Sequence, residues 1–216
     1  MIVIESAQAI EAAASEHSQE NVLRALAHEI RQPLSTIESI AYYLAMALSD
    51  SEEHREQLVR VQQLVEQSNW ILSNGLRLAD RRPVRPETVD LGELIAQTVK
   101  SRPSSIDPPV LCEFAPGLRS LQLDPGYGRA LIENVLGLFR QLATEIYPVR
   151  VRTSSGTDGV SLDVSTSVQG YRSILFLPPG SALSLDCVRR IAALHGGSSI
   201  HSIDPVSGIR VRVMLP

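Results

Sequence analysis

Apolar residues in the first quarter of the chain recur in steps of three and four, which predicts one long amphipathic helix. The repeat consists of Leu23, Leu26, Ile30, Leu34, Ile37, Ala41, Leu44 and Leu48. Its spacing is close to the 3.5-residue period of a helix that packs in a bundle. We expect this helix to begin near residues 4–7 and to include residues 22–48.

A second helix is expected over residues 53–79. The preceding run Ser49–Glu53 places capping side chains before acidic ones, as is typical of a helix start. Its looser seam consists of Leu58, Val61, Val65, Ser68, Leu72 and Gly75, supported by Leu64, Ile71 and Leu76. The two helices predict a hairpin. Because one hairpin cannot bury both faces of its seam, we expect two copies to pair as a dimeric four-helix bundle.

The pattern changes after a predicted linker over residues 81–87, which is rich in arginine and proline and has no apolar period. Helices are expected at 90–100, 128–143 and 183–194, and strands at 110–114, 120–123, 149–153, 160–166, 173–177, 199–203 and 209–214. This alternation predicts an α/β sandwich in which helices cover one mixed sheet. The expected organisation is therefore a hairpin over residues 1–80, the linker, and an α/β domain over residues 88–216.

Composition and net charge limit the classes of partner that we expect. The 216 residues are 44% hydrophobic and only 4% aromatic, which is enough for a largely aliphatic core. The net charge of −4 gives no reason to expect nucleic acid or an anionic membrane as the main partner.

Three features of the chain predict its cellular compartment. No stretch approaches the ~18 apolar residues of a membrane span, and the run Met1–Ile4 is too short for a signal peptide. Cys112 and Cys187 show no metal-binding spacing, so a reduced cytoplasmic setting is expected. We also expect no room for an input domain.

His28 is the strongest candidate for chemistry. It lies roughly 200° around the first helix from Leu26, so we expect it to point away from the apolar seam. An imidazole titrates near neutrality, and its neutral form offers a nucleophilic nitrogen at cellular pH. Glu29 could orient the ring or take its proton. Pro33 removes the amide that would bond to the carbonyl of Glu29, which predicts a bend just after the histidine.

The run Ala27–Leu34 resembles the H-box of two-component histidine kinases, in which the matching histidine carries a phosphoryl group. Gln32 stands where that family more often has threonine or asparagine, which puts phosphatase chemistry in doubt. Arg24, His28, Gln32 and Ser35 are expected to form one stripe on the helix. We predict that this stripe, with Arg24 and Arg31 steering an acidic pocket, binds response-regulator receiver domains.

The second half resembles the ATP-binding catalytic domain of the same kinases. The resemblance rests on Val89–Leu91, Asp124, Asn134, Ile191–Gly197 and Gly208–Pro216, in that order along the chain. With the H-box it extends over nearly the whole chain from about residue 20.

Three changes fall where that family binds nucleotide. Leu138 stands where a second asparagine holds magnesium, and leucine offers no oxygen ligand. Thr166 or a neighbour stands where an aspartate reads adenine. The run Gly180–Leu185 has lost two glycines that let backbone amides approach phosphates. We therefore expect a degenerate domain that binds no cofactor, with any magnesium supplied by the partner receiver.

The remaining histidines have no predicted chemistry. His195 is expected to serve the fold, and His17, His54 and His201 show no metal-ligand spacing. The preferred interpretation is a phosphorelay histidine phosphotransferase, resembling dimeric bacterial examples, in which His28 carries a phosphoryl group between receiver aspartates. One alternative is a diverged sensor histidine kinase. Another is a non-catalytic dimeric regulator that binds kinases or receivers.

Overall fold

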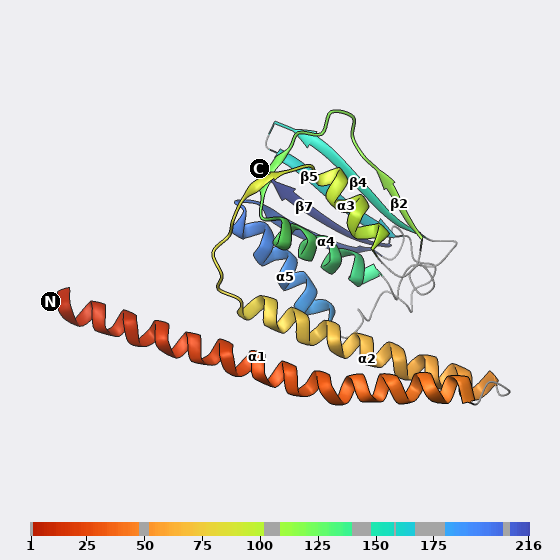
Figure 1. Ribbon diagram of the computed structural model, residues 1–216. Helices are drawn as coiled ribbons and strands as arrows, with labels where there is room; N and C mark the ends of the chain where they lie inside the picture. Colours follow the sequence, from red (N-terminus) through yellow and green to blue (C-terminus); the bar gives the residue numbers. More distant parts are fainter. Residues whose placement is uncertain are drawn as a thin grey trace. The chain divides into compact units, whose positions relative to one another are not determined.

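The computed structural model describes residues 2–47, 52–101, 109–139, 148–157, 159–166, 180–204 and 208–216, with only the backbone for residues 2–22 and 204. The chain divides into two compact units, residues 1–81 and residues 82–216. Figure 1 shows a helical hairpin in the first unit and an α/β domain in the second.

The first unit is the predicted hairpin of two helices. Helix α1 spans Ile2–Ala47 and continues through Pro33, and helix α2 spans Glu52–Ala79 and packs along it. Two glutamates in the first turn of α2 face the positive end of the helix dipole. The helix α1 begins before the expected residues 4–7, and the predicted bend after His28 stays a prediction.

The contact between the two helices uses small residues rather than the large ones of the sequence repeat. Ala27, Ala41 and Val65 are each only 3% exposed. The large apolar residues of α1 that remain exposed by 37–53% are Leu23, Leu26, Ile30, Ile37, Ile40 and Leu44. Most of the seam's large side chains are therefore not covered by α2, as expected for a single hairpin that cannot bury both faces of its seam.

The second unit is built around a five-stranded sheet in the order β2-β4-β5-β7-β6. These strands span Val110–Glu113 (β2), Val149–Gly156 (β4), Gly159–Thr166 (β5), Gly208–Leu215 (β7) and Ser198–Asp204 (β6). The β2–β4 pair is parallel and the other pairs are antiparallel, so the sheet is mixed as predicted.

Helices α3 (Leu91–Lys100), α4 (Pro125–Phe139) and α5 (Ser181–Leu194) lie on one side of this sheet. The core between sheet and helices includes residues with no exposed surface, namely Ile95, Val135, Phe139, Val149, Val160, Val188 and Val213. Alternate residues of β4 are buried and exposed, as expected for a sheet with one covered face. The α/β sandwich predicted from the sequence is confirmed.

A separate two-stranded sheet was not predicted. Strand β1 (Glu87–Val89) pairs antiparallel with β3 (Leu121–Leu123). The sequence placed residue 87 in the linker and residues 120–123 in the main sheet. Three-residue strands carry too little pattern for local reasoning, and their pairing depends on a contact between distant parts of the chain.

Caps explain where two helices begin. Asp90 accepts a hydrogen bond from the amide of Glu93 (2.9 Å) at the start of α3. Helix α4 begins at Pro125 rather than at the predicted residue 128, because Asp124 caps it and proline suits the first turn. Residues 140–143 of that prediction, the predicted strand 173–177 and Leu48 lie outside the described residues.

Two glycines end α5. Gly196 has a φ of 74°, and a Cβ at Gly197 would collide with the carbonyl oxygen of Met214 on β7. The amide of Gly197 donates to the carbonyl of Ala192 (2.9 Å), which closes the last turn.

Candidate functional site

His28 is exposed on α1, whereas its neighbour Ala27 is buried against α2. Successive helical residues point about 100° apart, so burying the alanine leaves the imidazole on the open side. An exposed imidazole can be reached by another protein or by a second domain.

Gln32 lies one helical turn after His28, and its side-chain nitrogen is 3.4 Å from Nε2 of the imidazole. An amide nitrogen can only donate, so Nε2 accepts and the neutral ring carries its proton on Nδ1. The lone pair of Nε2 is therefore on the side facing Gln32. No hydrogen bond or ion pair joins Glu29 to His28 within the described ranges, so the predicted role of Glu29 stays a prediction.

The residues of the predicted docking stripe are all exposed, and their docking role stays a prediction. Arg24, Gln32 and Ser35 are exposed with His28. Arg31 lies differently, since it reaches across the hairpin and donates to the Ser73 hydroxyl of α2 (3.0 Å). Arg24 lies 3.9 Å from Asp80 at the end of the same hairpin. Arg31 thus joins the two helices in this unit, and its steering role remains untested.

Asp124 is the centre of a polar cluster in the α/β unit. Its carboxylate accepts from the amides of Gly126 (3.0 Å), Tyr127 (3.0 Å) and Arg85 (3.1 Å). Burial opposes ionisation, but these amides and the nearby Arg82 guanidinium hold the pKa of the Asp124 carboxyl below its ordinary value.

The same cluster holds the linker onto α4. The Arg82 guanidinium lies 4.2 Å from the ring centre of Tyr127 and 3.7 Å from the Asp124 carboxylate. The Tyr127 hydroxyl donates to the Arg82 carbonyl (3.4 Å). Residues 82–85 are therefore fixed to the α/β unit, although the sequence treated them as a spacer. A run of arginine and proline gives no local signal of such contacts.

His195 serves the fold, in agreement with the sequence analysis. Its Nε2 accepts from the amide of Asp124 (3.1 Å), so the ring proton is on Nδ1, which lies 2.8 Å from the Ile191 carbonyl. Both ring nitrogens are thus engaged with the backbone.

Of the residues at the expected nucleotide site, some match the kinase motif and others depart from it. Asn134 on α4 is fully buried, donates to the Ala130 carbonyl (2.8 Å), and leaves Oδ1 without a partner among the described residues. The buried Ser181 hydroxyl, in the first turn of α5, is likewise unpartnered there. Leu138 is only 3% exposed and belongs to the core. Thr166, at the end of β5, donates to the Pro148 carbonyl (3.3 Å).

The described residues offer neither a cluster of metal ligands nor a helix that could span a membrane. They hold no group of three or more His, Cys, Asp or Glu side chains that could bind a metal ion. None of their helices is long and apolar enough to cross a bilayer.

The fold, a helical hairpin followed by an α/β sandwich, is similar to that of solved histidine kinase structures. Full-length ShkA in complex with AMPPNP matches with a TM-score of 0.62 at 20% identity, over 91% of this chain and 45% of that chain. The Acinetobacter baumannii histidine kinase AdeS matches with a TM-score of 0.55 at 13% identity, over 87% of this chain and 96% of that chain.

Sequence similarity leads to the same class. The chain is 28% identical to the sensor histidine kinase ZraS of Klebsiella oxytoca over 207 residues, 88% of this chain. It spans 44% of the length of that relative. No family model matches the sequence.

These comparisons correct the preferred interpretation of the sequence. The prediction of a phosphorelay histidine phosphotransferase is wrong, because the similar proteins are sensor histidine kinases. The error arose from weighing three altered nucleotide positions above the similarity of the rest of the chain. The comparisons support a histidine kinase core and not specifically a phosphotransferase, and the dimer and the cytoplasmic location stay predictions.

Proposed function

We propose that this chain is the phosphoryl-transfer core of a diverged sensor histidine kinase, in which His28 accepts a phosphoryl group. The observation that supports this most directly is the similarity to ZraS over 88% of the chain, a share too large to lie within either unit alone. The exposed His28 on α1 supplies a nucleophile on the hairpin.

The Gln32 contact indicates which ring nitrogen of His28 attacks. Nε2 carries the in-plane lone pair, which accepts from the Gln32 side-chain nitrogen (3.4 Å), so this bond must open before Nε2 attacks. In the transfer, a bond forms between Nε2 and phosphorus while the bond from phosphorus to the leaving oxygen breaks. Glu29 is proposed to accept the Nδ1 proton or to orient the ring once a phosphoryl donor is present.

The nucleotide would be held beside Asn134 and the start of α5. Two buried oxygens without described partners, Oδ1 of Asn134 and Oγ of Ser181, suit a ligand that donates hydrogen bonds. Leu138 does not suit magnesium, which requires oxygen ligands. We therefore propose that nucleotide binds weakly, with no magnesium ligand supplied by Leu138.

The expectation from the sequence, that this chain holds no cofactor and that magnesium comes with the receiver, stays a prediction. This expectation and the kinase proposal predict opposite effects of ATP on the melting temperature. A nucleotide whose free concentration is 100 times its dissociation constant would stabilise the folded chain by about 2.7 kcal/mol. A melting temperature that rises with ATP supports the kinase proposal, and an unchanged one supports a nucleotide-free domain.

The decisive experiment is autophosphorylation with ATP labelled at the γ-phosphate. We expect acid-labile label on the full chain and none on His28→Ala, which removes the nucleophile from an exposed position. The matched control is His54→Ala, because His54 is also an exposed histidine of the hairpin. Label that persists in His28→Ala, or its absence from the unaltered chain, would contradict the proposal.

Partner binding is proposed for the same helix. A second copy would cover the exposed apolar side chains of α1, and a response-regulator receiver would dock beside His28. Arg24→Glu should slow transfer to a receiver at low salt, while Arg129→Glu, an exposed arginine of α4, should not. Equal rates for both variants would place the receiver elsewhere.

A further inference from the structure

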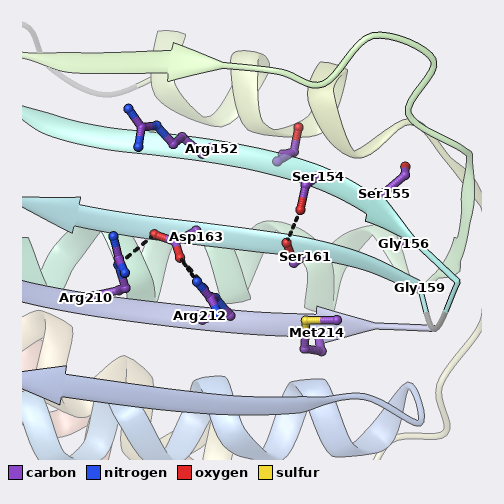
Figure 2. Close-up of a pocket in the computed structure, with 11 residues that line it drawn as sticks. Arg152, Ser154, Ser155, Gly156, Gly159, Ser161, Asp163, Arg210, Arg212 and Met214 are labelled. Carbon is purple, nitrogen blue, oxygen red and sulfur yellow. Dashed lines mark hydrogen bonds and ion pairs between the residues drawn. The ribbon is translucent and has the colours of Figure 1, made fainter.

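The outer face of the five-stranded sheet carries four arginines. Figure 2 shows Arg152, Arg210 and Arg212 on the face away from the helices. Strand register places Arg150 opposite Ser165, and Arg152 opposite Asp163, on the same face. We call the set Arg150, Arg152, Arg210 and Arg212, with Glu113 and Asp163, the arginine face.

The acidic residues of this face neutralise only half of its positive charge. Arg152 donates from Nε to Glu113 (2.8 Å), a bond that lowers the pKa of the Glu113 carboxyl. Arg210 and Arg212 share Asp163, at 3.2 Å and 3.0 Å. Among the described side chains of this face, four guanidinium groups stand against two carboxylates, a local charge of +2 on a chain whose net charge is −4.

The guanidinium groups keep donors for another ligand. Each arginine has five N–H donors in a planar fork that matches a carboxylate. In its ion pair with Asp163, Arg210 uses only Nε. The side chains of Arg152, Arg210 and Arg212 remain 49%, 52% and 44% exposed.

The arginine face is hollowed and has apolar margins. A hollow of about 460 Å³ is lined by Arg152, Asp163, Arg210, Arg212, Met214 and the serines of β4 and β5. Ile200 on β6 lies opposite Arg212 and is 64% exposed. Leu111 on β2 lies opposite Arg150 and is 47% exposed. Charge in the centre and aliphatic side chains at both edges are typical of protein interfaces, which are enriched in arginine.

We propose that the arginine face binds an acidic segment of a partner protein. Carboxylates of the segment pair with the guanidinium groups in the hollow, and its apolar side chains cover Ile200 and Leu111. An acidic peptide contributes both carboxylates and aliphatic side chains, whereas nucleic acid and anionic lipid headgroups offer no aliphatic side chains to cover Ile200 and Leu111. The net charge of −4 also opposes long-range attraction of such polyanions.

The test uses two variants of the full chain with equal charge. Arg150→Gln with Arg210→Gln removes the surplus charge and keeps the pairs Arg152–Glu113 and Arg212–Asp163. The control is Arg119→Gln with Arg129→Gln, two exposed arginines away from this face. The probe is a fluorescent peptide of alternating glutamate and leucine, measured by anisotropy without nucleotide. Circular dichroism checks that both variants are folded.

We expect the peptide to bind the unaltered chain and the control within twofold of each other, and the face variant at least tenfold more weakly. Replacing its leucines by serine should weaken binding further, because the apolar margins then gain no partner. Equal binding by both variants, or no binding of the peptide, would overturn the proposal. The proposal would also be overturned if a mixed-sequence oligonucleotide or phosphatidylserine vesicles bound more tightly than the peptide. The face would then select negative charge without regard to aliphatic side chains. None of these readouts depends on kinase activity.

Discussion

The two units differ in how completely their apolar residues are buried. In the α/β unit, Val135, Val160 and Val188 have no exposed surface, and helices cover one face of the sheet. In the hairpin, Leu26 and Ile30 on α1 remain 52% and 45% exposed. A sheet with helices on one face encloses a core by itself, whereas two helices share only one line of contact.

The comparison indicates that the units are stabilised by different means. The α/β unit has a core of its own, and the hairpin needs a further surface for its large apolar side chains. A contiguous exposed apolar patch of this kind marks an interaction site. The following predictions begin with the largest expected effect.

Ile30→Glu combined with Ile37→Glu should abolish dimerisation. Four carboxylates per dimer would face an apolar interface, and an uncompensated buried charge costs about 3–5 kcal/mol. Light scattering with gel filtration measures the mass. Ser35→Glu with Ser39→Glu is the control, since both serines are exposed on α1. A double-isoleucine variant that stays dimeric would place the interface on another surface.

Leu131→Ala should destabilise only the α/β unit. Leu131 is 1% exposed on α4, and removing a buried leucine side chain typically costs about 2–5 kcal/mol. Thermal unfolding followed by circular dichroism should show one transition moving to lower temperature while the hairpin transition stays. If both transitions move together, the units do not unfold independently.

Asp124→Ala should lower the stability of the α/β unit by about 1–2 kcal/mol at neutral pH, the upper range for a helix cap. The folded pKa of Asp124 lies below its unfolded value, so its stabilisation is complete above the unfolded pKa of about 3.9. That stabilisation is lost as the pH falls through the folded pKa. Below that pH the variant and the unaltered chain should have equal free energies of unfolding.

Denaturant unfolding at several pH values measures this effect. Asp90→Ala is the matched control, because Asp90 caps α3 through the amide of Glu93. Arg82 and Arg85 contact Asp124 in addition to its capping amides. An equal loss in both variants would show that these linker contacts contribute nothing.

Arg31→Ala should have the smallest effect, a loss of about 1 kcal/mol or less from the hairpin. The Ser73 hydroxyl would keep its own bond to the Asn69 carbonyl (2.8 Å), so little is left unsatisfied. Urea unfolding of the full chain measures the loss. A much larger one would show that Arg31 holds the hairpin together.

Much of the fold was predictable because its signals are local. The 3.5-residue period of α1, the Asp90 cap of α3 and the glycines after α5 each depend on residues close together in the chain. Pairing of β1 with β3 was missed, as was attachment of Arg82 and Arg85 to Asp124. Those contacts join residues 32 to 42 positions apart, for which no local period exists.

The candidate site shows the same division. The sequence predicted an exposed His28 from its position roughly 200° around the helix from Leu26. His28 is exposed, but Leu26 is itself 52% exposed, and the residue buried in the hairpin is Ala27. Only the tertiary structure showed that Arg31 bonds to α2, that Asn134 keeps an unpartnered buried oxygen, and that four arginines share one sheet face. Side-chain direction along one helix follows from its period, but contact between elements depends on how the chain brings distant residues together.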